Sequence, residues 1–187
     1  GEKGLDRVSQ TNKYVNGALD SVRDPSKEVL KAPVDEIILR GTHYVPNIGS
    51  TTSWGWPTNS GWTITSGYSW RTNPINGQRE LHDGIDIAGT GWGSPVYATN
   101  NGEIVVASYT YINGNYIIIN HNNGYYTYYG HMSSFNNVKV GQVVARGETI
   151  GFVGDTGWAT GAHVHYSIWR GYPWRNGSTT LNPLTFY

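Results

Sequence analysis

The sequence predicts an all-β protein: an antiparallel β-sandwich or folded barrel with long loops around a groove, preceded by a short N-terminal β-rich segment. The second part of the chain contains short runs of valine, isoleucine and tyrosine, which favour strands. Asn-Gly pairs, which are favoured in hairpin turns, stand beside these runs. No segment shows sustained helical periodicity, so the pattern favours antiparallel strands over alternating strands and helices.

The composition narrows the class of protein. The 187 residues include no cysteine and carry a formal net charge of zero, with 25 glycines, 14 tyrosines and 8 tryptophans. Disulfides and thiolate metal sites are therefore excluded, and the neutral charge gives no reason to expect nucleic acid as a partner. The sequence has no apolar run long enough to span a bilayer, so we expect no integral membrane segment. The chain also opens without a signal-peptide pattern, and we expect it to be part of a longer protein.

Residues 1–42 form the β-rich N-terminal segment and carry most of the charged side chains. Pro33 disfavours a continuous helix here, so we expect short strands before and after it, around Val29 and Leu30 and around 37–39. The pair Asn16-Gly17 predicts a turn.

The end of this segment, KAPVDEIILRGTH, resembles the last strand of a small extracellular β-module that is named for its recurrent glycines. That module often precedes wall-cleaving enzymes and is linked to adhesion and to binding of N-acetylglucosamine. The resemblance implies that residues 1–42 are the C-terminal part of such a module and that wall glycan is a partner of this segment. Residues 43–61 are rich in proline, glycine and small polar residues and are predicted to be a linker. We expect Trp54 and Trp56 to pack onto the domain that follows, residues 62–187.

Six runs in the second part of the chain are predicted to form strands. They are residues 103–108, 115–120, 125–131, 142–147, 149–154 and 163–169. The Asn-Gly pairs that stand between or beside them begin at Asn101, Asn113 and Asn123.

A first candidate site lies in the segment LHDGIDIAG. His82 and Asp86 are four residues apart, and Gly84 together with Ile85 and Ile87 disfavours a helix. On a single strand, His82 and Asp86 point to the same side. A carboxylate oxygen and an imidazole nitrogen both suit zinc, although this motif alone also fits a hydrogen-bonded turn.

Two other segments contribute histidines. His163 and His165 alternate with Val164 and Tyr166, so both imidazoles face one side of a strand. Two charged imidazoles on one face repel, and a metal on one with a proton role for the other removes that conflict. A hydrogen-bonded polar strand face is the alternative. His131 follows a tyrosine-rich strand near its end, where loops often carry function.

Together these segments hold four of the six histidines in the chain. Two histidines and one aspartate form a three-ligand zinc set that leaves a fourth position open for water. The two remaining histidines are then free to transfer protons, and this combination indicates hydrolysis.

A family resemblance covers about two thirds of the chain. The segments that carry it are SGYSWRTNPINGQRELHDGIDIA, GSPVYATNNGEIVVA, NYIIINHNNGYYTYYGHMS, VKVGQVVARGETIGFVGDTGWATGAHVHYSIW and LNPLTF. In this order they resemble the lysostaphin/LytM-type zinc metalloendopeptidases of peptidoglycan, which have the duplicated hybrid motif fold.

The resemblance implies a role for each site residue. The zinc ligands are His82, Asp86 and His165, and the catalytic pair is His131 and His163. All five positions carry the residue that an active member requires. Three departures from the family pattern are expected to affect packing and not metal chemistry: Ala162, Tyr166 and Ser167, where the family often has Pro, Phe and Glu.

The implied function is a Zn²⁺-dependent endopeptidase that hydrolyses peptide bonds in the stem peptide or cross-bridge of bacterial peptidoglycan. Zinc polarises the scissile carbonyl and lowers the pKa of bound water. One of His131 and His163 accepts the water proton and the other donates to the oxyanion, in an order that the sequence leaves open. We expect a monomer that is extracellular or associated with the cell wall, of bacterial or phage origin. The alternatives are a non-catalytic wall-binding or hydrolase-activating module of the same fold, and an adhesion or glycan-binding protein.

Four aromatic residues are candidates for lining the substrate groove, with strand packing as an equal alternative: Tyr128, Tyr129, Trp92 and Trp158. Asn73 belongs to the matched core segment, so we do not expect it to fill the open zinc position, as an asparagine can in latent family members. His43 and His121 are expected to lie at the surface or to have structural roles.

Overall fold

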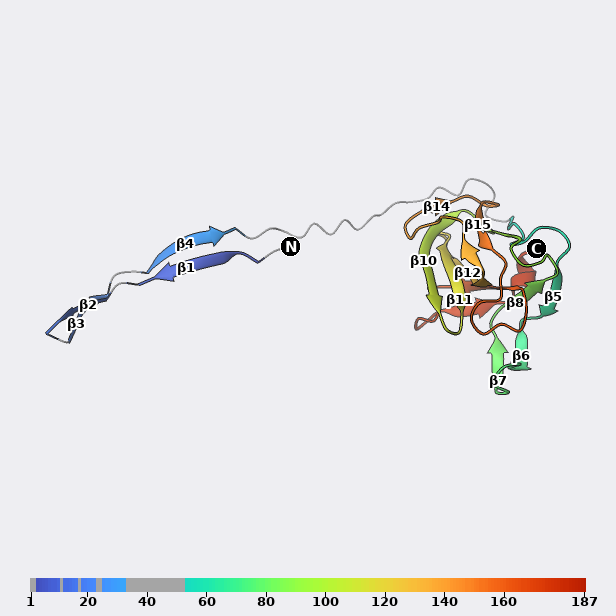
Figure 1. The fold of residues 1–187 in the computed structure, drawn as a ribbon, viewed down its shortest axis with the longest axis horizontal. Coiled ribbons are helices and arrows are strands. Elements are labelled where there is room, and N and C mark those ends of the chain that lie inside the picture. Colours follow the sequence, from blue (N-terminus) through green and yellow to red (C-terminus); the bar gives the residue numbers. More distant parts are fainter. Residues whose placement is uncertain (1–2, 11, 17, 23–24, 33–52) are drawn as a thin grey trace. The chain divides into compact units, whose positions relative to one another are not determined.

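The computed structural model describes the whole chain except residues 1–2, 11, 17, 23–24 and 33–52 (Figure 1). It divides into two compact units, residues Gly1–His43 and Tyr44–Tyr187. Regular structure in the described residues is β-strand, apart from one 3₁₀-helix at Pro183–Phe186. The all-β prediction is therefore confirmed. Among the described helical residues, no segment has the length and apolar character of a membrane span.

The first unit contains two antiparallel ribbons. β1 (Leu5–Ser9) pairs with β4 (Ser26–Lys31), and β2 (Asn12–Val15) pairs with β3 (Ala18–Val22). At the turn between β2 and β3, Asn16 has φ 48°, a left-handed conformation that asparagine tolerates better than most residues. The turn predicted at this point is thus present.

The side chains of the β1–β4 ribbon lie at the surface. Val29 and Leu30 lie in β4, as predicted, and both are exposed. Lys27 forms an ion pair with Asp6 across the ribbon at 2.7 Å. The strand that we expected at residues 37–39 lies outside the described residues, as does His43.

The second unit is built on an antiparallel eight-stranded sheet. Its order is β14 (Val143–Val144), β10 (Gly102–Thr110), β11 (Gly114–Asn120), β12 (Tyr125–Met132), β16 (Val164–Arg170), β8 (Ile85–Ala88) and β5 (Thr63–Ser66), with β17 (Thr179–Leu181) also paired to β16. A three-stranded sheet contains β13 (Ser134–Phe135), β15 (Thr149–Phe152) and β9 (Pro95–Tyr97), and a separate hairpin contains β6 (Ser69–Thr72) and β7 (Arg79–His82).

Each of the six predicted runs overlaps one of these strands. The short strands β5 to β9, β13 and β17 were not among the named runs, because segments of two to four residues carry too little alternation to stand out. The Asn-Gly pairs at Asn113 and Asn123 lie in the turns on either side of β11, whereas the pair at Asn101 leads directly into β10.

The side chains of the central strands pack on both faces of the sheet, in two separate clusters. Ile117 and Ile119 of β11 point into the main core, whereas Ile118 packs on the opposite face with Tyr128 and Trp169. This alternation is the period-two geometry of a strand. The outer face of the sheet, opposite the main core, therefore carries a second, smaller apolar cluster.

Trp54 and Trp56 pack onto this unit, as expected from the sequence. The ring centroids of Trp54 and Phe186 are 5.3 Å apart, and those of Trp56 and Tyr187 are 4.9 Å apart. The Tyr187 hydroxyl donates a hydrogen bond of 3.0 Å to the carbonyl of Gly55. Tyr187 is thereby held against the segment that precedes β5.

His121 has a structural role in this core, where its side chain is 2% exposed. Its Nδ1–H donates to the carbonyl of Asn101 at 2.7 Å, and its Nε2 lies 2.8 Å from the Thr127 hydroxyl. Burial lowers the pKa of His121 to about 4. The imidazole is therefore neutral in the folded protein over the physiological pH range.

We expect this burial to make stability depend on pH. Between pH of about 6.5 and 4, unfolded His121 binds a proton and the folded residue does not, so the free energy of unfolding falls as the pH falls through this window. Across the whole window, His121 lowers the free energy of unfolding by about 3 kcal/mol. Urea unfolding at several pH values should show a flatter pH dependence for His121→Gln than for the wild type.

Thr127→Val is the matched control, because it removes a hydrogen-bond partner of His121 and leaves the titrating group in place. This variant should lose stability and keep most of the pH dependence. An unchanged slope in His121→Gln would show that other groups control stability in this range.

Candidate metal centre

The outer face of the main sheet carries two of the predicted ligands side by side. The register of β8 and β16 pairs Asp86 directly with His165. Their strand neighbours Ile85, Ile87 and Tyr166 are fully buried in the core. Because side chains alternate along a strand, the packing of these three residues turns Asp86 and His165 outward.

The third predicted ligand comes from a different strand. β7 ends at His82 and β8 begins at Ile85, so the expectation that His82 and Asp86 share one strand is corrected. The chain bends at Asp83 and Gly84 because β16 passes very close to this point. A Cβ atom on Gly84 would lie 2.4 Å from the carbonyl oxygen of Tyr166.

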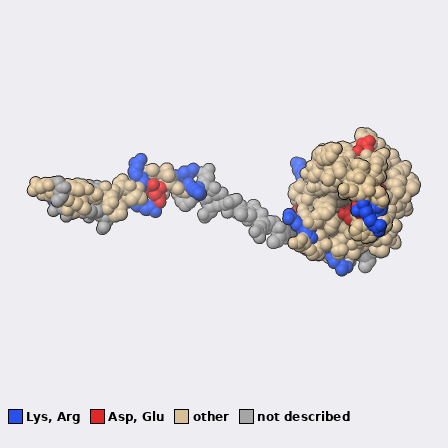
Figure 2. All heavy atoms as spheres, turned by 90° about the horizontal axis from the view of Figure 1, so that it is seen from below, with Lys and Arg blue, Asp and Glu red and all other residues tan. Residues whose placement is uncertain are grey.

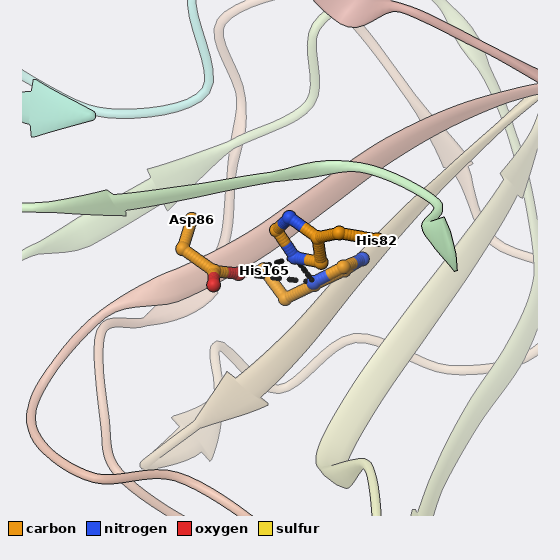
Figure 3. A group of neighbouring side chains, drawn as sticks. All are labelled: His82, Asp86 and His165. Atoms are coloured by element: carbon orange, nitrogen blue, oxygen red, sulfur yellow. Dashed lines mark hydrogen bonds and ion pairs between the residues drawn. The ribbon is translucent and has the colours of Figure 1, made fainter. Parts of the chain in front are cut away.

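The three side chains converge on one point (Figure 3). His82 Nε2 lies 3.1 Å from Asp86 Oδ1 and 3.0 Å from His165 Nδ1. His165 Nδ1 lies 3.0 Å from Asp86 Oδ1. The structure therefore brings together the full set of predicted metal ligands, and these residues form a cluster that could hold a metal ion.

Hydrogen bonds on the far side of each ligand determine which atom faces this point. His82 Nδ1 lies 2.8 Å from the carbonyl of Gly67, which can only accept, so Nδ1 carries the proton and Nε2 presents a lone pair. Arg71 donates to Asp86 Oδ2 at 3.1 Å, which leaves Oδ1 at the centre. His165 Nε2 lies 3.1 Å from Asp83 Oδ1.

The electrostatics of the centre favour a positive charge. Burial opposes the charged form of His165, but hydrogen bonds and charges from Asp83 and Asp86 outweigh it and raise its pKa to about 9. Burial also opposes ionisation of Asp86, but hydrogen bonds from His165 and His82 hold the pKa of this carboxyl far below its usual range. Both shifts have the same origin, since the carboxylates and imidazoles at the centre stabilise each other's charged forms.

The donor set fits zinc. Two His nitrogens and one Asp oxygen are zinc donors, and a set of three leaves a coordination position for water. Donors of a tetrahedral zinc site at about 2.0–2.2 Å from the ion are roughly 3.4 Å apart. The three donor atoms here are 3.0–3.1 Å apart, so they already lie close to the required positions.

The two remaining histidines lie beside the metal centre. The ring centroids of His131 and His163 are 4.8 Å apart, and His163 Nε2 lies 3.8 Å from Asp86 Oδ1. Nδ1 of His131 donates to the carbonyl of Thr156 at 2.8 Å, and Nδ1 of His163 donates to the carbonyl of Gly161 at 2.7 Å. In the neutral form of each ring, Nε2 is therefore the free proton acceptor.

His131 is held in an unusual backbone conformation. It lies near the end of β12 with φ 59°, which is uncommon for a residue with a large side chain. Its amide donates to the carbonyl of Asn113 at 2.9 Å, and this bond helps to maintain the conformation. Burial lowers the pKa of His131 to about 4, so the ring is neutral near pH 7. Backbone strain of this kind often accompanies function.

Two larger cavities and a small one surround the centre. A cavity of about 280 Å³ is lined by residues that include Glu80, Asp83, Tyr128, Trp158 and Trp174. A second, of about 330 Å³, is lined by residues that include Thr65, Ser66, Thr72, Thr160 and His163. Arg71 lines both cavities, and the small one contains His131, His163 and His165. In Figure 2, the larger unit is hollowed near its centre, and acidic atoms lie inside the hollow.

The four aromatic candidates occupy different environments. Tyr128 and Trp158 line the 280 Å³ cavity. Tyr129 is fully buried in the core, and Trp92, which is 66% exposed, lines none of these cavities. Tyr129 is separated from the groove because it lies one residue along β12 from Tyr128 and so points to the opposite face.

Sequence reasoning missed two charged residues that contact the ligands, Arg71 and Asp83. Asp83 stands directly after the predicted ligand His82, and this position in the sequence could have identified it as a residue of the site. Asn73 lines the first cavity, and its side chain is held within the β6–β7 hairpin. Its amide nitrogen donates to Glu80 at 2.8 Å, and its Oδ1 accepts from the amide of Ile75.

Comparison with known families agrees with this geometry. Residues 80–183 match the model of peptidase family M23, which is 104 of the 187 residues. The chain belongs to this family. Residues 1–43 match the model of the G5 domain, which confirms the predicted small β-module. M23 enzymes are zinc metallopeptidases, as the donor set indicates.

Two characterised relatives are similar to the C-terminal unit. Peptidoglycan DD-endopeptidase ShyA of Vibrio cholerae is 41% identical over 120 residues, which cover 63% of this chain and 27% of that protein. DD-carboxypeptidase/endopeptidase Mpg of Neisseria meningitidis is 42% identical over 122 residues, which cover 65% of this chain and 26% of that protein. The chain thus spans about a quarter of the length of these relatives.

Solved structures show the same fold. The catalytic domain of the antimicrobial peptidase lysostaphin from Staphylococcus simulans matches with a TM-score of 0.59 and 34% identity, and the match covers 67% of this chain and 91% of that one. A zinc containing peptidase from Vibrio cholerae matches with a TM-score of 0.57 and 26% identity over 87% of this chain and 52% of that one. The predicted lysostaphin-type fold is confirmed.

Gly84→Ala should damage the metal centre. The added methyl group would lie 2.7 Å from His165 Nε2 as well as against the backbone of β16, so the two strands must separate. We expect a lower melting temperature and weaker zinc binding, measured by thermal unfolding and by competition with a chelator. Gly55→Ala is the control, because its methyl group meets the Arg146 side chain at 3.2 Å and should leave zinc binding unchanged. Equal zinc affinity in both variants would contradict the role of this close approach.

Proposed function

We propose that this chain is a zinc-dependent endopeptidase that hydrolyses peptide bonds in the stem peptide or cross-bridge of bacterial peptidoglycan. The observation that carries the proposal is the convergence of three donor atoms within 3.0–3.1 Å of one another, beside a pair of histidines. Membership of family M23 and similarity to named peptidoglycan endopeptidases support the same reaction and substrate.

The metal is assigned to His82 Nε2, Asp86 Oδ1 and His165 Nδ1. When bound, zinc supplies a Lewis acid for the scissile carbonyl and makes water more acidic. The protein contributes the orientation of its ligands, since Gly67 holds His82 and Arg71 holds Asp86 from behind.

The proton transfers are assigned to His131 and His163 as a pair. Each ring has its Nδ1–H fixed by a backbone carbonyl, and each leaves Nε2 free as an acceptor. One ring can therefore remove a proton from the attacking water and later return it to the leaving amine. The other, when protonated, can donate a hydrogen bond to the oxygen of the carbonyl under attack.

The cavities on either side of the metal centre fit an extended peptide. Arg71 lines both larger cavities, so they are adjacent, and the small cavity between them contains the histidine pair. Because ShyA and Mpg are named for action at D,D-bonds, D,D-cross-linked peptides belong among the test substrates. We further propose that the protein acts as a monomer outside the cell or at the wall, and that the G5 segment contacts wall glycan.

The direct test is digestion of purified cell walls with different cross-bridges by the zinc-loaded chain. Mass spectrometry of the products identifies the new amino termini and therefore the bond that is cleaved. We expect soluble peptides with one class of new terminus, and no cleavage after treatment with a chelator. An intact wall in the presence of stoichiometric zinc would overturn the proposal and would instead support a non-catalytic binding module.

Two groups of variants should separate metal binding from proton transfer. His82→Ala and Asp86→Ala remove metal donors, so both zinc content and activity should be lost. His131→Ala and His163→Ala should keep stoichiometric zinc and lose at least about 100-fold in turnover, because general acid–base catalysis contributes about 10²–10⁴-fold. Metal analysis and wall-digestion rates provide the measurements. Full turnover by His163→Ala would contradict its assignment.

A further inference from the structure

One carboxylate in the first cavity has no part in the reaction described above. Asp83 lies in the bend between β7 and β8, next to the ligand His82, and its side chain is 31% exposed. Its Oδ1 lies 3.1 Å from Nε2 of His165, on the side of the ring that faces away from the metal centre. This contact links a residue at the bend to a ligand on β16.

The two ring nitrogens of His165 face different partners. Nδ1 lies 3.0 Å from Asp86 Oδ1 and 3.0 Å from His82 Nε2, so it is the atom that the centre requires as a lone-pair donor. A neutral imidazole that donates a lone pair from Nδ1 carries its proton on Nε2. Among the described residues, Asp83 is the acceptor at that position.

We propose that Asp83 is a positioning residue that fixes His165 in the Nε2–H tautomer and in the ring orientation that presents Nδ1 to the metal. The inference rests on the proposed zinc site and adds a residue to it. Carboxylates that accept from the outer nitrogen of a ligating histidine commonly contribute to metal affinity in this way.

The residues packed around His165 make its contact with Asp83 possible and restrict other orientations of its ring. Gly84 has no Cβ, and a Cβ there would lie 2.7 Å from His165 Nε2 and would obstruct the approach of the carboxylate. On another side, the Tyr128 ring stands edge-on to the His165 ring with centroids 5.6 Å apart, which limits rotation of the imidazole. The tripeptide His82-Asp83-Gly84 thus supplies one ligand, the partner of a second ligand, and the space for both.

The Asp83 carboxylate also faces the 280 Å³ cavity, so direct contact with substrate is the competing role. The two roles differ in what they affect. A positioning residue changes zinc affinity in the absence of any substrate, whereas a substrate contact changes KM or kcat at constant zinc affinity.

The test compares zinc affinity in three variants of this chain. Asp83→Ala removes the acceptor, Asp83→Asn keeps an uncharged acceptor oxygen of similar shape, and Glu103→Gln removes a carboxylate on β10 that lines none of the three cavities. Competition with a chromophoric chelator gives the dissociation constant of Zn²⁺ without any wall present. We expect a loss of about 10–100-fold for Asp83→Ala, a smaller loss for Asp83→Asn, and no change for Glu103→Gln.

A second readout follows the His165 ring itself. In the zinc-loaded protein, ¹H–¹⁵N spectra of the imidazoles should show a slowly exchanging Nε2–H for His165. This proton should exchange faster in Asp83→Ala, with the other ligand histidine unaffected. If Asp83→Ala fails to fold, Asp83→Asn is the test variant, and its His165 Nε2 resonance should shift while zinc affinity falls severalfold.

The outcomes separate the two proposals. A folded Asp83→Ala variant that binds zinc within twofold of the wild type, with an unchanged His165 resonance, overturns the positioning role. So does a loss of turnover at unchanged zinc affinity, which assigns Asp83 to the substrate. If wild-type protein binds zinc but leaves all walls intact, the proposed reaction fails while the effect of Asp83 on zinc binding still stands.

Discussion

The metal centre depends on the register between β8 and β16. Asp86 stands opposite His165 because Ile85 and Ile87 on one strand and Tyr166 on the other fill the core. A shift of this register by one residue would bury the ligands and expose the apolar side chains. The burial free energy of several apolar residues would then be lost. The hydrophobic core therefore sets the position of two ligands before any metal binds, and the same packing that stabilises the fold prepares the site.

The cation site follows from where the protons are held. A backbone carbonyl fixes the proton of His82 on the far side of its ring, and Arg71 occupies the far oxygen of Asp86. When His165 carries its proton on Nε2, three lone pairs face one another at 3.0–3.1 Å, and a positive charge between them removes the repulsion. The polar groups that surround the ligands thus matter as much as the ligands, since they determine which atoms are offered.

Most of the fold could be predicted from the sequence, and so could the residues that it brings together at the proposed site. The alternation of His163 and His165 with apolar residues reports a strand face directly, and long runs such as 115–120 are clear strands. The bend after His82 could not be predicted, because LHDGIDIAG alternates like one strand and the cause of the break is a contact with β16, far away in sequence. The sequence also does not show which tyrosines of β12 face the core, because both faces of YYTYY carry aromatic rings. Only the packing in the structure shows that Tyr128 borders the groove while Tyr129 lies in the core.

The location of the site on the outer face of the sheet has a consequence for substrate access. The core side of the main sheet is filled by side chains, so the proposed peptide substrate must lie across the outer face. The loop after β16 places Trp174 on Tyr128 and Trp169, with ring centroids 5.3 and 5.5 Å apart. Trp174 has φ 58°, an outlier for a bulky residue, and this packing offsets the cost of that conformation. A half-exposed indole is thereby held at the wall of the cavity beside the metal centre, on a support that is itself part of the sheet.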